Sequence, residues 1–216
     1  MIALYSNLVM NELTGNLRED VHYFLTMNGC QQTAEHSMKV GEEAKQIAEM
    51  FGADPLEAEH AGYLHDVSAV FPNEQRVTIS QQLGLEVLPE EEVFPMIIHQ
   101  KLSKEMARSL FNISNPAILN AVGCHTTLRK HASLLDMVLF VADKIAWDQP
   151  GTPPYLQEIR QELEKSVEHA CYSYIRYLWQ KRESLRVIHP WLKEAYYELE
   201  ARLHADEGII HVKRNT

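Results

Sequence analysis

Six histidine and aspartate side chains recur between residues 36 and 143 at intervals that suit one donor per helix. They are His36, the adjacent pair His65 and Asp66, His99, His125 and Asp143. The intervals are 29 residues from His36 to His65, 33 from Asp66 to His99, 26 to His125 and 18 to Asp143. Burying several such side chains in one place is costly unless they have partners. Six nitrogen and oxygen donors that converged from five helices would build a two-metal site, whereas any one histidine on an apolar helix face is more often a hydrogen-bonded core residue.

Helical periodicity dominates the rest of the sequence. From residue 36 to residue 51 the apolar side chains repeat at helical spacing, and Gly52 follows as a natural stop. Asp54 and Pro55 supply an N-cap carboxylate and a proline for the first helical position. We therefore expect a helix here that carries the His65–Asp66 pair near its end.

Further helices are expected after a connector. Residues 67–90 contain two prolines and a glycine, and we interpret them as a connector with one short helix near residues 76–83. Helices are then expected at 94–111, from Asn115 and Pro116 through His125, and from the N-cap Ser133 to the region of residue 145. No alternating, strand-like segment competes with these helices, so the predicted fold class is all-α.

The segment QPGTPPY at 149–155 is the clearest break in the chain, because proline and glycine punctuate helices. It predicts one domain at 1–148 and a C-terminal helical extension at 149–216 that packs on the same domain. Long amphipathic helices are expected at 155–186 and 190–204, followed by an irregular or frayed end. The extension is rich in aromatic residues, which suit either a core or an interface, so a homodimer is possible. These aromatics are Tyr172, Tyr174, Tyr177, Trp179 and Trp191.

Composition excludes several classes of protein. The net charge of -10 disfavours nucleic-acid binding, since such proteins usually display a basic face. The longest apolar run near the six donors covers only residues 137–142, whereas a membrane span needs about 20 apolar residues. The N-terminal segment does not resemble a signal peptide. Three cysteines without metal-ligand spacing argue against a disulfide framework, so we expect a reducing, cytoplasmic location.

The ordered set of donors, taken with its flanking residues, resembles the HD-domain phosphohydrolases. More narrowly, it resembles the YqeK-like branch, which hydrolyses symmetrical dinucleoside tetraphosphates. The matching stretches are EHSMKVGEEA (35–44), AGYLHDVS (61–68), IIHQKLSKEMA (97–107), AILNAVGCHTT (117–127) and LDMVLFVADKI (135–145). The resemblance covers roughly residues 20 to 145. It implies an all-α HD-domain helical bundle with additional C-terminal helices.

The resemblance also implies how two divalent metals are held. One would be bound by His36, His65, Asp66 and Asp143, and the other by Asp66, His99 and His125. Asp66 would bridge the metals, and His65 and Asp66 are the expected catalytic residues, working with a metal-activated hydroxide. Imidazole and carboxylate ligands suit iron, manganese or zinc rather than calcium, and iron is what the resemblance implies. The formal charge of such a site is about +1, which is compatible with a small phosphorylated substrate.

The segment HTTLRKH at 125–131 is similar to the rim of the family's substrate pocket. Thr126 and Thr127 can offer hydroxyl or backbone hydrogen bonds. Arg129 can bind a phosphate in a bidentate manner. The alternative interpretation, that Arg129 is a solvated charge in a loop, has equal weight. His131 is either a phosphate contact or a solvated loop residue, and Lys144 is a further candidate beside Asp143.

The remaining histidines are expected to lie outside the site. His60 precedes His65 by five residues on the same helix, so its side chain should point elsewhere and be structural or on the surface. Cys124 is interpreted as a small buried residue rather than a nucleophile. Five further histidines are expected on the surface, and these are His22, His169, His189, His204 and His211.

Three positions depart from the family pattern. Where the family commonly has a lysine three residues after the His-Asp pair and an arginine three before the first histidine, this chain has Ala69 and Thr33. Where the family often has Ile-Glu-Pro followed by an arginine, this chain reads IAWDQPG at 145–151. Trp147 in that segment can stack on a base, but packing against the C-terminal helices is the preferred reading.

These observations favour a metal-dependent hydrolase of nucleotide phosphoanhydride bonds. Diadenosine tetraphosphate, cleaved symmetrically to two ADP, is the substrate that the resemblance implies. The changes at Ala69 and Thr33 leave a second hypothesis, a nucleotide-binding sensor with little or no turnover. A hydrolase of another phosphorylated nucleotide and a di-iron oxygenase are further alternatives. The expected partner is a small-molecule nucleotide, without nucleic acid or membrane.

Overall fold

The computed structural model describes residues 3–147 and 149–214, and within these ranges the chain is helical and contains no strand. This confirms the all-α prediction. In the described residues no helix has both the length and the apolar character needed to cross a bilayer. The α-helices are α1 (Leu17–Met27), α2 (Gln31–Phe51), α3 (Pro55–Leu64), α4 (Asn73–Gln82), α5 (Pro89–Val93), α6 (His99–Leu110), α7 (Pro116–Val122), α8 (Leu134–Ile145), α9 (Leu156–Leu163), α10 (Val167–Gln180) and α11 (Pro190–Arg214). Short 3-10 helices are η1 (Ala3–Tyr5), η2 (Val67–Val70) and η3 (Arg182–Ser184).

Three helix ends predicted from the sequence are confirmed. Gly52 ends α2 in the left-handed conformation with φ 79°, which glycine adopts without steric cost. Asp54 caps α3 by accepting the N–H groups of residues 56 and 57 at 2.9 and 3.0 Å. Ser133 caps α8 and forms a capping box with Asp136. These local signals set where the helices that carry the predicted donors begin and end.

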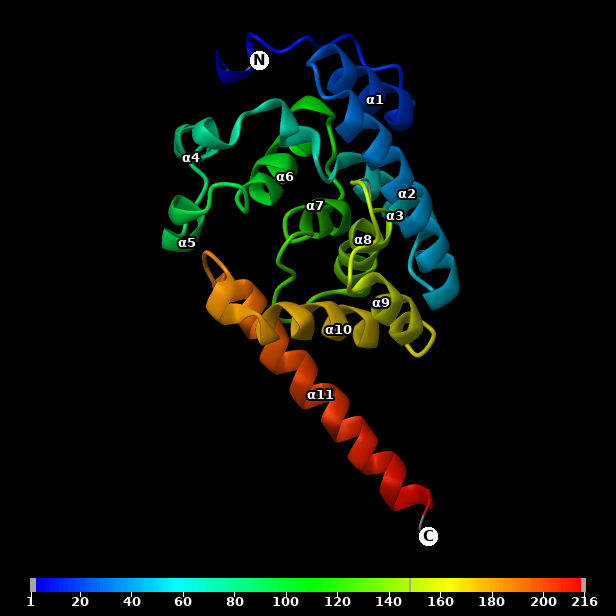
Figure 1. Cartoon of the computed structure of the whole chain (residues 1–216). Coiled ribbons are helices and arrows are strands. Elements are labelled where there is room, and N and C mark those ends of the chain that lie inside the picture. Colours follow the sequence, from blue (N-terminus) through cyan, green and yellow to red (C-terminus); the bar gives the residue numbers. More distant parts are fainter. Residues whose placement is uncertain (1–2, 148, 215–216) are drawn as a thin grey trace.

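Helix α8 lies at the centre of the helical body, with α2, α3, α7 and α10 packed around it (Figure 1). Its residues 138–142 are almost fully buried. Burying one such side chain contributes about 1.5–3 kcal/mol relative to leaving it exposed, so this helix anchors the core. Because Asp143 follows directly on this buried run, its backbone position is fixed by the packing around α8.

A close approach of two glycines sets the contact between α2 and α3. A methyl group placed on Gly62 would lie 2.5 Å from the Cα and 2.6 Å from the N of Gly41. A methyl group on Gly41 would overlap the Tyr63 ring. The two helix backbones therefore meet where neither residue can carry a side chain. This contact brings the helix that carries His36 against the helix that ends before His65.

We predict that Gly62→Ala lowers the free energy of unfolding by about 2 kcal/mol, because the added methyl group would push against backbone atoms rather than a movable side chain. The measurement is urea denaturation followed by circular dichroism. The control is Glu49→Ala on the exposed face of α2, which should leave stability near the wild type. A Gly62→Ala protein as stable as the wild type would contradict the proposed close contact.

Four predicted segments differ from the structure. The helix expected at 94–111 begins at His99, because residues 94–98 form turns with backbone bonds such as Ile97 N–H to the Phe94 carbonyl. Helix α7 ends at Val122, so His125 lies in the turn beyond it. The helix expected at 155–186 is divided into α9 and α10, because Ser166 caps a new start by accepting the His169 N–H. The irregular end expected after residue 204 is wrong up to residue 214, where α11 still continues, while residues 215–216 lie outside the described part.

The chain after the break at 149–155 returns to the helical body. Helix α10 packs on α8 and α9, while α11 starts against the body and extends away from it (Figure 1). The predicted division of the chain at residue 148 stays a prediction, and residue 148 itself lies outside the described residues.

His189 joins this C-terminal part to the body through a buried ionic group. Its surface assignment is wrong, because it is only 2% exposed. Its Nδ1 accepts the Trp191 N–H at 3.2 Å, so its Nε2 carries the hydrogen and donates to Glu91 Oε1 at 3.4 Å. Glu91 is fully buried and also pairs with Lys101 at 2.8 Å. Burial tends to raise the pKa of Glu91, but the hydrogen bonds from His189, the Leu88 N–H and Lys101 hold it below its ordinary value.

We predict that Glu91→Gln destabilises the protein by about 2 kcal/mol at neutral pH, the range for hydrogen bonds to a charged group. Because the folded-state pKa of Glu91 is depressed, its stabilisation is present above its unfolded pKa of about 4.3 and is lost as pH falls through the lower folded value. Denaturant unfolding of both proteins from pH 7 to pH 3 tests this. The difference between them should shrink only at the acidic end, and a pH-independent difference would contradict the role given to the charge.

Candidate metal centre

The four predicted histidine ligands share one orientation, set by backbone carbonyl groups. In each ring Nδ1 lies at hydrogen-bonding distance from a carbonyl oxygen, so in the neutral form of the ring Nδ1 carries the hydrogen and Nε2 keeps a lone pair. Three of the carbonyls belong to the residue three positions earlier in the chain. The pairs are His36 with Ala146 at 3.1 Å, His65 with Gly62 at 2.7 Å, His125 with Val122 at 2.8 Å, and His99 with Met96. All four Nε2 atoms are thereby prepared to bind a cation.

The Asp66 carboxylate lies between two groups of imidazoles. Its Oδ1 is 3.0 Å from His99 Nε2 and 3.6 Å from His125 Nε2, while its Oδ2 is 3.5 Å from His65 Nε2. One oxygen thus faces each group. The ligand atoms of two sets, His36 with His65 and Asp66, and Asp66 with His99 and His125, lie within 4.8 Å of one another. Asp66 is the member that both sets share.

Asp143 adds a second carboxylate to the first of these sets. Its Oδ1 is 3.1 Å from His36 Nε2 and 3.5 Å from His65 Nε2. The structure therefore brings together all six side chains that the sequence suggested as ligands, although they come from segments more than a hundred residues apart. The ring centroids of successive histidines, from His36 through His65 and His125 to His99, are 4.8–5.2 Å apart.

Two features of the donor set fit divalent metal ions. The buried Nε2 of His65 has no hydrogen-bond partner among the residues that the structure describes, which is costly unless a cation satisfies it. The Nε2 atoms of His99 and His125 lie 2.9 Å apart, and both carry lone pairs in the tautomers set by their carbonyl partners. Two lone pairs at that distance repel each other unless a proton or a cation lies between or beside them. The residues present therefore fit a pair of metals with nitrogen and oxygen ligands.

The electrostatics of the carboxylates favour cation binding as well. Burial alone would raise the pKa of Asp66, but the His65 and His99 imidazoles hold it well below its usual range. Burial would likewise raise the pKa of Asp143, and Lys144 leads the groups that hold it well below that range. Both carboxylates are therefore ionised at neutral pH.

The two most deeply buried imidazoles respond in opposite ways. Burial lowers the pKa of His125 to about 4, so this ring is neutral and available as a ligand at neutral pH. Burial also acts to lower the pKa of His65, but Asp66 and Asp143 outweigh it and raise the pKa to about 9. The negative charges of Asp66 and Asp143 thus favour either a proton on His65 or a metal ion beside it. Metal binding is therefore expected to release that proton.

Buried polar side chains that the sequence analysis missed hold the ligand-bearing segments together. Gln100 Oε1 accepts the N–H groups of Thr126 and Thr127 at 3.1 and 3.3 Å, which fixes the turn after His125. Ser68 donates to the His99 carbonyl at 2.9 Å and accepts from Ser103 at 2.9 Å. These bonds join the turn after Asp66 to α6. Nothing in the local sequence marks these residues, because their partners are 26 to 35 residues away.

Arg76 on α4 is a further cation near the centre that was missed. Its Nε donates to the Phe71 carbonyl at 3.0 Å. Burial lowers the pKa of its guanidinium, and Asp66, Cys30 and Glu74 are the acidic groups close enough to oppose that effect. Arg76 therefore places a positive charge close enough to Asp66 for the two groups to interact, and it follows Ala69 by seven residues in the chain.

The three predicted substrate-binding residues lie in different surroundings. The Thr126 hydroxyl is 3.2 Å from both His99 Nε2 and His125 Nε2, so it borders the donor set. Thr127 is buried and bonds to Gln100 and to the Leu128 carbonyl, so its hydroxyl is committed inside the protein. Arg129 is paired with a buried carboxylate rather than directed at the donors. Its Nε and Nη2 donate to Asp136 Oδ2 at 3.0 and 2.7 Å, which supports the start of α8.

The other candidates lie outside the donor set or support it. His60 is half-buried on α3 and belongs to neither group of ligand atoms. His131 contacts Glu198 of α11 through both its N–H and its Nδ1. Cys124 is buried, and burial raises the pKa of its thiol far above the usual value, which agrees with a packing role. Trp147 packs edge-to-face against Tyr155 at 6.3 Å, in keeping with the preferred reading.

The surface assignments of the remaining histidines have mixed outcomes. His204 is exposed, as expected, whereas His22 and His169 are half-buried. The side chain of His211 lies outside the described part of the chain.

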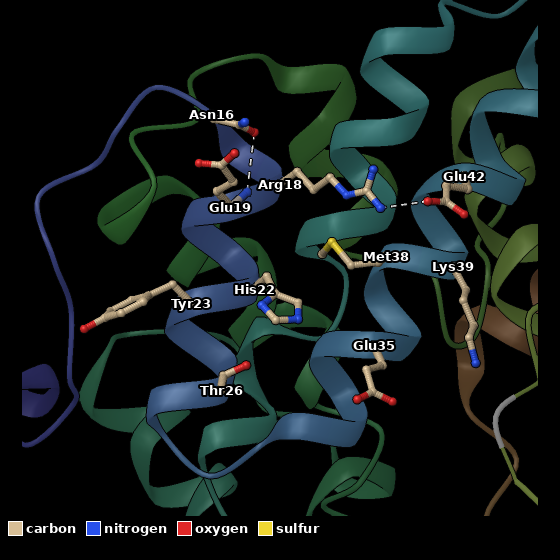
Figure 2. A pocket seen from close by; sticks show the side chains of 10 residues that line it. All are labelled: Asn16, Arg18, Glu19, His22, Tyr23, Thr26, Glu35, Met38, Lys39 and Glu42. Atoms are coloured by element: carbon tan, nitrogen blue, oxygen red, sulfur yellow. Dashed lines mark hydrogen bonds and ion pairs between the residues drawn. The ribbon is translucent and has the colours of Figure 1, made fainter.

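The donor set opens toward solvent at Asp66. The Asp66 side chain is 26% exposed, whereas that of His65 is fully buried. A separate open cavity of about 980 Å³ lies between α1 and α2, where Arg18 pairs with Glu42 (Figure 2). None of the six donor residues lines that cavity, although Glu35 and Lys39 on α2 do. The six donors therefore lie outside this cavity, and Asp66 has the most exposed side chain among them.

Comparison with protein families gives one match over more than half of the chain. The family described as "HD domain" matches residues 33–148. A crystal structure from Clostridium acetobutylicum, described as a predicted HD superfamily hydrolase involved in NAD metabolism, superposes with a TM-score of 0.78 at 23% identity. The match covers 85% of this chain and 97% of that one. It shows that the two chains share a fold.

Curated relatives extend the comparison. A Lactococcus lactis subsp. cremoris protein named "Uncharacterized protein in pepC 5'region" is 43% identical over 143 residues, covering 66% of this chain and 72% of that protein. The symmetrical bis(5'-nucleosyl)-tetraphosphatase of Halalkalibacterium halodurans is 26% identical over 156 residues, 70% of this chain and 81% of its own. Its namesake in Bacillus subtilis is 28% identical over 144 residues, 65% and 74% of the two chains.

We predict that Asp66→Ala reduces metal affinity by about 100-fold or more, because loss even of a residue that only supports a ligand costs roughly 10–100-fold. Both sets of ligand atoms lose their shared member in this variant. Metal content by mass spectrometry, with helical content by circular dichroism, is the measurement. His60→Ala is the matched control and should keep its metal, and full metal content in Asp66→Ala would exclude the bridging role.

Proposed function

The chain belongs to the HD-domain family and is an HD-domain hydrolase, and from this premise we propose that it cleaves a phosphoanhydride bond of a nucleotide. The proposed substrate is a symmetrical dinucleoside tetraphosphate, with diadenosine tetraphosphate giving two ADP. The observation that carries the proposal is the pair of His/Asp donor sets that share Asp66. The names of the relatives from Halalkalibacterium halodurans and Bacillus subtilis support this choice of substrate.

The donor sets divide naturally between two divalent metals. His36, His65, Asp66 and Asp143 would hold one, and Asp66, His99 and His125 the other. When bound, the metals supply a water of lowered pKa and neutralise charge on the reacting phosphate. We propose iron, with manganese or zinc as alternatives that the same ligands accept.

The protein's own residues hold this chemistry in place. The four carbonyl bonds to Nδ1 keep the imidazoles oriented, so little reorganisation is needed when a charged substrate arrives. Phosphate groups enter at the exposed side of Asp66. There the Thr126 hydroxyl can donate to a phosphate oxygen, and the Arg76 charge attracts the polyphosphate. Positioning and charge neutralisation account for most of phosphoryl-transfer catalysis, which suits a site built in this way.

In the proposed reaction, the oxygen of one water attacks a central phosphorus of the tetraphosphate. The bond that breaks joins this phosphorus to the central bridging oxygen, which lies between the two inner phosphorus atoms. That oxygen leaves with the other half of the molecule. One water and one diadenosine tetraphosphate therefore give two ADP and release protons to solvent. No oxidant takes part, which separates this reaction from oxygenase chemistry at a di-iron centre.

A second candidate function is a nucleotide-binding sensor with little turnover. It is favoured by the residues at the expected substrate rim, since Arg129 is paired with Asp136 and Thr127 is buried. Ala69 and Thr33 also lack the charges that the family commonly has at those positions. In this alternative the ligands remain, but the contacts that orient the phosphates for attack are weakened.

We predict that protein purified without oxygen and loaded with iron or manganese converts diadenosine tetraphosphate to two ADP, because the paired donor sets suit hydrolysis. Chromatography of the products from a panel that includes diadenosine triphosphate, ATP and NAD is the measurement. Chelation should abolish turnover, and adding metal back should restore it. The matched control is His60→Ala, which should turn over like the wild type.

Each outcome of this panel separates one hypothesis from another. Two ADP per substrate supports the proposal, whereas ATP with AMP would exclude symmetrical cleavage. Tight binding without products would favour the sensor. Substrate loss that occurs only with oxygen would favour oxygenase chemistry.

A further inference from the structure

Lys144 occupies an unusual position beside the candidate metal centre. It is only 8% exposed, although lysine is rarely buried without a partner. Its Nζ donates to Asp143 Oδ2 and lies 3.4 Å from the His125 carbonyl oxygen. The ammonium group thus touches one ligand residue through its side chain and another through its backbone.

Two aromatic rings enclose the same ammonium group. Nζ lies 5.1 Å from the centroid of the Phe140 ring and 5.6 Å from that of Tyr174. The two rings meet edge-to-face at 5.6 Å. A cation within about 6 Å of an aromatic face is attracted by the electron density of the ring, and more strongly so when the cation is shielded from water. Lys144 is therefore enclosed by two aromatic rings as well as by its oxygen partners, and it cannot swing out to solvent without losing these contacts.

The two carboxylate oxygens of Asp143 have different neighbours. Oδ1 faces His36 and His65 at 3.1 and 3.5 Å, while Oδ2 faces Lys144. An ammonium group has only donors, so it can hold Oδ2 but cannot compete for the cation that Oδ1 faces. With Oδ2 occupied, Asp143 has one oxygen left for a metal.

We propose that Lys144 is a positioning residue that presents Asp143 as a one-oxygen ligand, and that Tyr174 holds Lys144 in place. Since Tyr174 lies on α10, the C-terminal extension then contributes to the geometry of the metal centre rather than only covering the domain. This inference rests on the metal centre of the proposed function. It concerns metal affinity, however, and does not depend on which nucleotide is cleaved.

The test is calorimetric titration of metal-free protein with Mn²⁺. The wild type is expected to bind two ions. Lys144→Met should weaken one of them, the ion at the His36, His65 and Asp143 side, by roughly 10–100-fold, the usual effect of removing a group that orients a ligand. The ion held by Asp66, His99 and His125 should keep its affinity. Lys104→Met is the matched control, because Lys104 is half-buried on α6 and bonds only to Asn120 among the described side chains.

A pair of variants at Tyr174 tests the same idea from the other helix. Tyr174→Phe keeps the ring and should bind both ions like the wild type, whereas Tyr174→Leu removes it and should weaken the same single ion as Lys144→Met. Circular dichroism establishes that each variant is folded. Should Lys144→Met fail to fold, the Tyr174 pair still decides the question.

The outcomes distinguish this inference from the proposed function. Unchanged affinity for both ions in folded Lys144→Met, or equal affinities in the two Tyr174 variants, would overturn the positioning role. A wild type that binds two ions but hydrolyses no nucleotide would overturn the proposed function alone. Rescue of affinity by Lys144→Arg, which keeps the charge, would support the role of a cation at this position.

Discussion

The candidate site depends on the hydrogen bonds between backbone carbonyls and the Nδ1 atoms of four histidines. Each bond fixes a tautomer and a ring orientation, and so leaves Nε2 as a directed lone pair. Three of the carbonyls belong to the residue three positions before their histidine. The orientation of these three rings is therefore set by the local backbone at a helix end or a helix start. The fourth comes from Ala146, at the end of α8, and ties α2 to the helix that carries Asp143.

Helix α8 links the chemistry to the core. Its middle is buried among apolar side chains, while both of its ends carry paired charges. At the start, Asp136 forms a capping box with Ser133 and also pairs with Arg129. At the end, Asp143 and Lys144 lie beside the donor set. Asp143 lies within this helix and not in a loop, so its position is defined by the contacts that hold the helix at both ends.

The C-terminal extension is bound to the body by contacts of two kinds. The buried group of Glu91, Lys101 and His189 holds the start of α11 against α5 and α6. Aromatic packing between Phe140 and Tyr174 joins α10 to α8. Ionic and apolar contacts thus attach residues beyond the break at 149–155 to helices of the body. Lys144 contacts both Tyr174 of α10 and the candidate ligand Asp143.

Local signals in the sequence predicted the positions of several helix ends. Capping by Asp54 and Ser133 and the stop at Gly52 depend on neighbouring residues only, so they could be recognised without a structure. The six donors could be recognised because their order and flanks resemble a known family. The division between α9 and α10 was missed because the apolar periodicity continues on both sides of the cap residue Ser166. A single serine inside such a run is a weak sign that one helix ends and another begins.

The partners of individual side chains could not be predicted in this way. Arg129 offered a guanidinium in a loop, and only the fold placed it against Asp136. His189 had no distinguishing flanks, and only the packing of α11 buried it beside Glu91. Gln100, Arg76 and Tyr174 likewise gain their roles from segments distant in the chain. The sequence by itself determined the helical periods, the caps and the supply of donor atoms, because these depend on short stretches of chain. The tertiary structure alone decided which charges meet, which are buried and which face the entrance, because those outcomes depend on distances between helices that no local pattern encodes.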